Sequence, residues 1–193
     1  MGDRMSAGLT APGYRQLSGV TAVSVRFLPG DSAAQAALQA QGLPWVQAHS
    51  PTPGKMAGAD PFVCWRTPRE LLAIGFNAPP LRALLDSLSA GQHDLAMAID
   101  VSEALTVFEL SGSALECWLM RLVDATAVPR EPGTVSSCRL ADAPTLLLRL
   151  AADSLWLVVE RPSALYVAEW LDYTQSAVRA AQITTAKEPA TCT

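Results

Sequence analysis

The chain has few charged side chains and very little histidine. Only 17% of its 193 residues are Asp, Glu, Lys or Arg, and it contains 2 histidines, whereas soluble domains usually carry about 25% charged residues. Hydrophobic residues reach 50%, with 5 Trp. Because monomers rarely leave large apolar patches in water, this composition predicts that another protein covers part of the surface.

Several classes of function lack their sequence signatures. The formal net charge of −4 argues against binding to phosphate backbones, which requires clustered Lys and Arg. No apolar run approaches the roughly 20 residues that cross a bilayer. The N-terminus, MGDRMSAGLT, lacks the apolar core of a secretory signal. We therefore expect a cytoplasmic protein whose partners are neither nucleic acid nor membrane.

The cysteines do not form a metal motif. There are 4 of them, none in a CxxC pair, and no adjacent His completes a zinc site. Cys64 and Cys117 lie in apolar segments, where a reduced thiol behaves as a small hydrophobic group. We expect these thiols to be buried and reduced, Cys192 to be exposed in a polar tail, and the chain to hold no metal site.

A catalytic constellation is also missing. There is no GxGxxG, the turn whose backbone amides approach the pyrophosphate of a dinucleotide. His49 lies in a proline-rich loop and His93 in a hinge, and we interpret both as solvated histidines. Asp100 precedes a strand, and one carboxylate alone gives no acid–base pair, so a capping role is favoured. We predict no catalytic residue, and no cofactor-binding residue can be assigned.

Two stretches of the chain repeat one hydrophobic pattern. Residues 20–90 and 98–178 each have the order strand, helix, two strands, helix, with period-two alternation in strands and helical spacing in helices. The alignment of the two stretches matches Gly30 with Gly112, Arg66 with Arg149 and Leu71 with Leu155. We predict an α+β fold of two βαββα halves, ferredoxin-like in layout, that form one pseudo-symmetric domain over residues 19–178.

The segments outside the repeated pattern are polar or rich in proline. Residues 1–18 are predicted to be a mobile N-terminal arm that orders only against a partner, and residues 179–193 a polar C-terminal tail. Residues 43–61 hold four prolines and are predicted to be a long loop. Trp45 and Trp65, in or beside this loop, are either docking residues or lids on the core of the first half.

The second half has the stronger hydrophobic pattern. The runs 145–148 and 155–159 are continuously apolar, which is typical of strands covered on both faces. Helices would cover one face, and the companion half or a partner the other. The last helix is predicted to pack through Val167, Trp170 and Leu171. Alternatively, Trp170 joins Arg161 and Tyr166 in an interface anchor, because these residue types are enriched at binding hot spots.

Residues 98–123, AIDVSEALTVFELSGSALECWLMRLV, resemble the start of the folate-binding domain of aminomethyltransferases, the family of the glycine cleavage T-protein. The shared features are Asp100-Val101-Ser102, a strand, the Ser111-Gly112 turn and a helix from Ala114. Downstream, SCRLADAPTLLLRLAADSLWLVVERPSALYVAEWL more closely resembles the gamma subunit of heterotetrameric sarcosine oxidase. This second match includes Cys138-Arg139, residues 144–150, Arg161 with Ser163, and the aromatic helix 166–171.

The chain departs from the aminomethyltransferase pattern at three places. Glu103 stands where those domains commonly have His, and residues 140–144 replace an acidic pair. Glu160 and Arg161 occupy positions where Asn is usual. These departures weaken the expectation of tetrahydrofolate binding to this chain.

The resemblance to the sarcosine oxidase family implies a complex with a large alpha subunit and a flavin-bearing beta subunit. FAD, FMN, NAD and tetrahydrofolate would then lie on those partners, with no cofactor on this chain. The complex would demethylate an N-methyl amino acid oxidatively, and this chain would be a non-catalytic gamma subunit that assembles or stabilises it. The alternatives are a free-standing tetrahydrofolate-binding or C1-transfer domain of the aminomethyltransferase type, and an unrelated scaffold.

Overall fold

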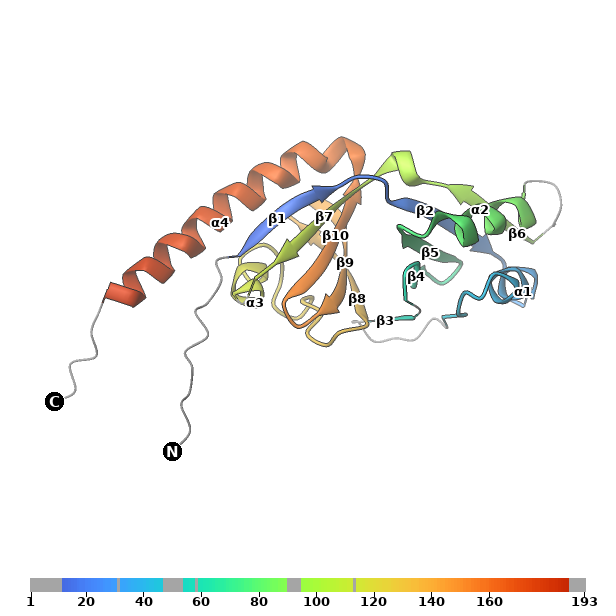
Figure 1. Cartoon of the computed structure of the whole chain (residues 1–193), viewed down its shortest axis with the longest axis horizontal. Helices are drawn as coiled ribbons and strands as arrows, with labels where there is room; N and C mark the ends of the chain where they lie inside the picture. The colour runs from blue at the N-terminus through green and yellow to red at the C-terminus, as the bar shows by residue number, and fades with distance from the viewer. Residues whose placement is uncertain are drawn as a thin grey trace, which may run out of the picture.

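The structure, a computed structural model, describes residues 12–30, 32–46, 54–57, 59–89, 95–112 and 114–187. Figure 1 shows two groups of strands joined into one elongated molecule, with helices at the outer sides. The first half contains β1 (Gly13–Leu17), β2 (Thr21–Phe27), α1 (Ala33–Ala40), β3 (Gly54–Ala57), β4 (Phe62–Thr67), β5 (Glu70–Gly75) and α2 (Ala78–Ser87). The second half contains β6 (Ala96–Asp100), η1 (Ser102–Ala104), β7 (Leu105–Ser111), α3 (Leu115–Leu119), β8 (Thr134–Leu140), β9 (Ala143–Ala151), β10 (Ser154–Glu160), η2 (Arg161–Ser163) and α4 (Ala164–Lys187).

The predicted repetition of an α+β unit is confirmed, but the unit is longer than expected. Each half has the order ββαβββα, with one-turn 3₁₀ helices added in the second half. The strands missing from the sequence-based prediction are β1, β3, β6 and β8. Three of them are only four or five residues long, too short to display a clear period of two.

The strands form one antiparallel series in which the two halves exchange a strand. Its order is β1-β7-β10-β9-β8-β3-β4-β5-β2-β6. β1 precedes β2 in the chain but pairs with β7, and β6 precedes β7 but pairs with β2. Interchanging the halves and reading the order backwards gives the same series. The β8–β3 pair therefore marks the centre of an approximate twofold relation.

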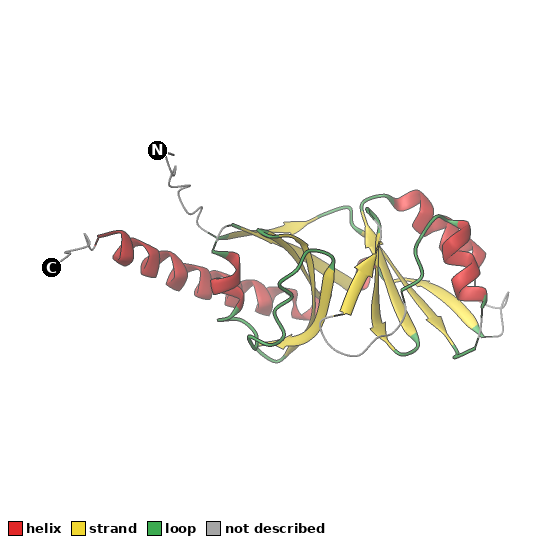
Figure 2. Ribbon diagram, turned by 90° about the horizontal axis from the view of Figure 1, so that it is seen from below, coloured by secondary structure: helices red, strands yellow, loops and turns green. Residues whose placement is uncertain are grey.

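The series bends into two sheets that pack face to face. We call β1 and β7–β10 sheet A, and β2–β6 sheet B. Figure 2 shows helices at the two ends with the strands between them. Helices α3 and α4 cover the outer face of sheet A, and α1 and α2 that of sheet B. The inner faces meet in an inter-sheet core, formed by Ala22, Cys64, Leu72, Ile74, Leu105, Val107, Val135, Leu146, Leu148, Trp156 and Val158.

The continuous apolar runs of β9 and β10 follow from this arrangement. Successive side chains of a strand point to opposite faces, so Leu147 and Leu157 pack under α3 and α4. Their neighbours Leu146, Leu148 and Val158 lie in the inter-sheet core. The second layer that the sequence required is thus the companion half.

Both terminal segments are more ordered than predicted. Gly13–Leu17, placed in the mobile arm, form β1 because β7 offers an open edge; residues 1–11 lie outside the described residues. The tail expected from residue 179 begins later, since α4 continues to Lys187 through residues that include the good helix formers Ala, Gln and Lys. The long loop predicted for residues 43–61 contains β3, which pairs with β4 and β8.

The sequence alignment of the halves is one residue out of register at β4. Leu71 pairs with Trp65, and Leu155 pairs with Arg149. Since Leu71 corresponds to Leu155, the counterpart of Arg149 is Trp65 rather than Arg66. A bulge between Trp65 and Thr67 accompanies this difference. Arg66 therefore faces the space between the sheets, whereas Arg149 faces the helices.

We predict that Gly75→Ala destabilises the protein by about 2–4 kcal/mol, because overpacking and a lost helix cap add together. Asp60 accepts hydrogen bonds from the backbone N–H groups of Phe76 (2.7 Å) and Asn77 (3.2 Å) at the start of α2. A Cβ on Gly75 would lie 1.9 Å from Asp60 Oδ1 and 2.7 Å from Pro61 Cα. Urea unfolding of the full chain measures the loss.

Gly13→Ala is the matched control. Its Cβ would meet nothing nearer than Gln175 Nε2 at 3.9 Å, so its free energy of unfolding should stay within about 0.5 kcal/mol of wild type. Equal effects of the two substitutions would contradict the steric explanation.

Candidate functional site

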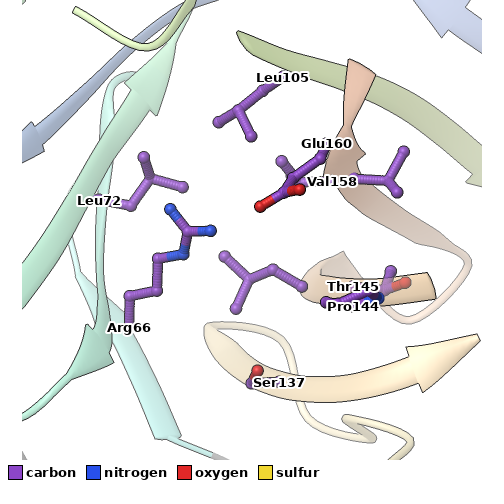
Figure 3. Close-up of a pocket in the computed structure, with 10 residues that line it drawn as sticks. Arg66, Leu72, Leu105, Ser137, Pro144, Thr145, Val158 and Glu160 are labelled. Carbon is purple, nitrogen blue, oxygen red and sulfur yellow. The ribbon is translucent and has the colours of Figure 1, made fainter. Parts of the chain in front are cut away.

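A small cleft opens between the two sheets beside the inter-sheet core. Its apolar walls include Leu72 of β5, Leu105 of β7 and Val158 of β10. Figure 3 shows Arg66 and Glu160 reaching toward it from opposite sheets. The enclosed volume is about 50 Å³, room for one or two water molecules. The cleft itself is therefore narrow.

The cleft continues into a wider groove of about 720 Å³. The charged residues that line it are Arg26, Arg66, Glu70, Glu103, Glu160 and Arg161. Most of them pair within the groove. Arg66 Nη1 lies 3.3 Å from Glu70 Oε1, and Arg161 Nη2 lies 2.9 Å from Glu103 Oε2. Three cations face three anions, so the groove selects neither an anionic nor a cationic ligand by charge.

The Glu103–Arg161 ion pair joins two of the positions at which the sequence departs from the aminomethyltransferase pattern. Glu103 belongs to η1 and Arg161 to η2. The side chain that replaces the expected His is thus matched by a cation at the position where Asn is usual. Both side chains are exposed. Each has the other as its charge partner at the edge of the groove.

Asp100 has the capping role that the sequence favoured. Its Oδ1 accepts hydrogen bonds from Ser102 N–H (2.9 Å) and Ser102 Oγ–H (2.6 Å). Ser102 Oγ in turn accepts a bond from the backbone N–H of Ala22 (2.9 Å). Asp100 and Ser102 therefore fix the β6–β7 connection against β2.

The unpartnered buried polar groups do not point to a ligand in the cleft. Among the described residues, the buried side-chain nitrogen and oxygen atoms without a hydrogen-bond partner belong to Trp65, Ser136 and Arg149. Trp65 packs under the helices of sheet B. Ser136 and Arg149 lie opposite Leu147 and Leu155, on the helix side of sheet A. In the described part of the chain, none of these orphaned groups is directed into the cleft. The cleft alone is smaller than the roughly 300–1,000 Å³ of ligand pockets, whereas the adjoining groove of about 720 Å³ lies within that range.

The outer face of α4 carries an exposed row of aromatic side chains, Tyr166, Trp170 and Tyr173, which we call the aromatic row. Their exposed fractions are 44%, 37% and 72%. Ring centroids are 6.5 Å apart for Tyr166 and Trp170, and 5.9 Å apart for Trp170 and Tyr173, both edge to face. The packing role expected for Trp170 is therefore wrong. Val167, Leu171, Thr174 and Val178 fill the buried face at helical spacing, and Trp170 lies about 100° away from Leu171.

β1 is fastened to α4 by polar contacts. Tyr14 Oη donates to Asp172 Oδ1 (2.8 Å), and Gln175 Nε2 donates to the Pro12 carbonyl oxygen (2.8 Å). Burial and the Asp172 carboxylate raise the pKa of Tyr14 to about 12. The Tyr14 ring also packs edge to face on Phe108, 5.9 Å between centroids. The sequence did not indicate the two hydrogen bonds because they join residues 158 and 163 positions apart.

Trp45 and Trp65 line neither the cleft nor the groove. The Trp45 ring lies tilted against that of Phe27, with 5.1 Å between centroids, and Trp45 and Trp65 both pack as lids on the helix-side core of sheet B. His49 and His93 lie outside the described residues, as does Cys192.

Only one of the two cysteines expected to be buried is buried. Cys64 lies in the inter-sheet core, where burial raises the pKa of its thiol to about 12. Cys117 is exposed, because Leu115, Trp118 and Leu119 take the buried face of α3. Within the described ranges, no group of His, Cys, Asp or Glu could hold a metal ion. No described helix is long and apolar enough to cross a membrane.

The α+β fold is shared with part of an aminomethyltransferase. The chain is similar to the glycine cleavage system aminomethyltransferase T from Bartonella henselae, with a TM-score of 0.54 and 13% identity over 83% of this chain and 45% of that one. This similarity concerns the fold alone, and the chain spans less than half of the length of that protein.

A second similarity is stronger. A chain of the heterotetrameric sarcosine oxidase from Corynebacterium sp. U-96, determined in complex with pyrrole 2-carboxylate, matches with a TM-score of 0.74 and 26% identity, over 86% of this chain and 85% of that one. No protein-family model and no curated protein matches the sequence. The resemblance to sarcosine oxidase and, more distantly, to aminomethyltransferases is confirmed by the structure.

We predict that Tyr14→Phe removes a pH-dependent part of the stability. Because the folded pKa of Tyr14 is about 12 against an ordinary 10.0, the folded state holds the phenolic proton more tightly. That contribution is present below pH 10 and is lost as the pH rises toward 12. Wild type should therefore lose unfolding free energy more steeply than Tyr14→Phe between pH 9 and 11.5, as measured by urea unfolding.

The control for this prediction is Tyr173→Phe, which changes an exposed hydroxyl. Its pH dependence should follow wild type, since other titrating groups cancel in the comparison. Parallel curves for wild type and Tyr14→Phe would contradict the raised pKa of Tyr14 in the folded chain.

Proposed function

We propose that the chain is a non-catalytic gamma-type subunit that assembles or stabilises a flavin-dependent, heterotetrameric sarcosine oxidase-type complex. The observation that carries this proposal is the match to a chain of such an oxidase over nearly equal shares of both chains, 86% and 85%. The two chains are thus counterparts along most of their lengths. In the aminomethyltransferase, by contrast, the matching part covers 45% of the enzyme.

The chemistry of the described residues supports a non-catalytic role. The acidic side chain that the family resemblance singled out, Asp100, is held by Ser102. The charged side chains Arg66 and Arg161 have carboxylate partners inside the groove. General acid–base catalysis needs a positioned group that can exchange a proton with substrate, and these groups are engaged within the chain.

In this proposal the reaction takes place on the other subunits. They would carry FAD, FMN, NAD and tetrahydrofolate, which together supply hydride transfer and accept the released one-carbon unit during oxidative demethylation of an N-methyl amino acid. A large alpha and a flavin-bearing beta subunit would be the partners, in the cytoplasm. This chain would contribute folded surface, consistent with its 17% of charged residues and its exposed aromatic row.

Co-expression tests the proposal. Expressed alone, the full chain should aggregate or form heterogeneous oligomers, because apolar surface meant for a partner is left in water. Expressed with the alpha and beta subunits, it should elute with them as one complex in size-exclusion chromatography with light scattering. A stable, well-behaved monomer that ignores both subunits would overturn the proposal.

The alternative function, a free-standing tetrahydrofolate-binding domain, is supported by the shared fold and makes a different prediction. A ligand that binds only the folded state stabilises it, by about 2.7 kcal/mol at a ligand concentration of 100 times the Kd. Such a ligand therefore raises the melting temperature. We expect no shift of the isolated or complexed chain's own transition with millimolar tetrahydrofolate. A concentration-dependent rise would favour the alternative.

A further inference from the structure

The exposed aromatic row on α4 stands apart from other surface features. Leu165, Tyr166, Trp170 and Tyr173 are all large, apolar and exposed, and they lie within nine consecutive residues. Figure 1 shows α4 running along the outside of the molecule, away from sheet B and its helices. No described element of this chain covers the row.

The row is presented on a rigid support. The opposite face of α4 is buried through Val167 and Leu171, and Thr174 Oγ1 accepts a 2.8 Å hydrogen bond from the buried indole N–H of Trp118. Tyr14 and Asp172 add a second anchor. The edge-to-face contacts between the three rings restrict their rotamers further. Little conformational entropy would be lost when such a surface binds.

The charge around the row indicates what kind of surface it fits. Glu169 is exposed next to Trp170, and no basic side chain lies between residues 162 and 178. Asp172 lies on the other flank of α4, where it accepts the hydrogen bond from Tyr14. A second copy packed through the same surface would bring its own Glu169 to an acidic surface. Helices that lie in membrane interfaces are rich in Lys and Arg, unlike this one. A surface with basic residues around an apolar groove complements it.

We propose that the aromatic row inserts into an apolar groove on a larger subunit of the complex, and that a Lys or Arg side chain at the groove rim faces Glu169. This is the helix-in-groove mode of recognition, with Trp170 as the central anchor, since Trp and Tyr dominate binding hot spots. The inference rests on the proposed function, because it assumes that a larger subunit exists.

The test compares variants of the full chain, each co-expressed with the tagged alpha and beta subunits. The double variant Trp170→Ser/Tyr173→Ser removes the central and the most exposed ring. Leu28→Ser is the control, because Leu28 is 43% exposed, like Tyr166 at 44%, but follows β2 in the other half. The double variant should bind at least about 30-fold more weakly, and Leu28→Ser within about twofold of wild type.

Two measurements keep the test independent of folding. Circular dichroism and the melting temperature of the chain in each complex or alone identify a variant that fails to fold. If the double variant fails to fold, Tyr173→Ser alone replaces it, because Tyr173 is 72% exposed and, among the described residues, its ring contacts only that of Trp170. It should weaken binding about fivefold or more.

Glu169→Lys tests the charge complementarity. Reversing one rim charge should slow association at low salt, and 0.5 M NaCl should largely remove the difference, because screening shortens the range of the interaction. Faster or unchanged association at low salt would exclude a basic rim.

The outcomes separate the two proposals. If wild type does not bind the alpha and beta subunits, the proposed function fails. If wild type and the double variant bind equally, the docking surface is wrong and the proposed function stands. A homodimer of wild type that the double variant dissolves would assign the row to a second copy and overturn the inference.

Discussion

The packing of the two sheets against each other is the interaction on which the rest of the structure depends. Neither sheet is complete within one half, because β1 joins sheet A and β6 joins sheet B. Eleven side chains from both sheets then close the inter-sheet core. This core and the exchanged strands join the two halves, since burial of apolar surface favours their association.

The same packing constrains function. Apolar side chains of both sheets fill the inter-sheet core, and paired charges line the groove beside it. Glu103 pairs with Arg161, and Arg66 pairs with Glu70 within sheet B. The outer face of α4 is a second candidate binding surface. Branched residues fill the positions of α4 that face sheet A, so the aromatic residues of the helix lie on its exposed side.

The repeated elements could be predicted because their hydrophobic periods are local. Continuous apolarity in β9 and β10 correctly required two covering layers. Short strands such as β3 could not be predicted, since their order comes from partners distant in sequence. The prediction that Trp170 is buried was wrong for a related reason. Several residues of α4 have the helical spacing of a buried face, and only the contact with sheet A decides that Val167 and Leu171 form it.

The sequence by itself determined the α+β class, the two similar halves, the capping role of Asp100 and the family resemblance. Each of these depends on residues that lie close together in the chain. The tertiary structure alone decided the exchange of β1 and β6, the face on which Arg66 lies, the Glu103–Arg161 pair and the exposure of the aromatic row. These depend on register and on which surfaces meet. A shift of one residue in a strand reverses the direction of its side chains, and no local pattern records it.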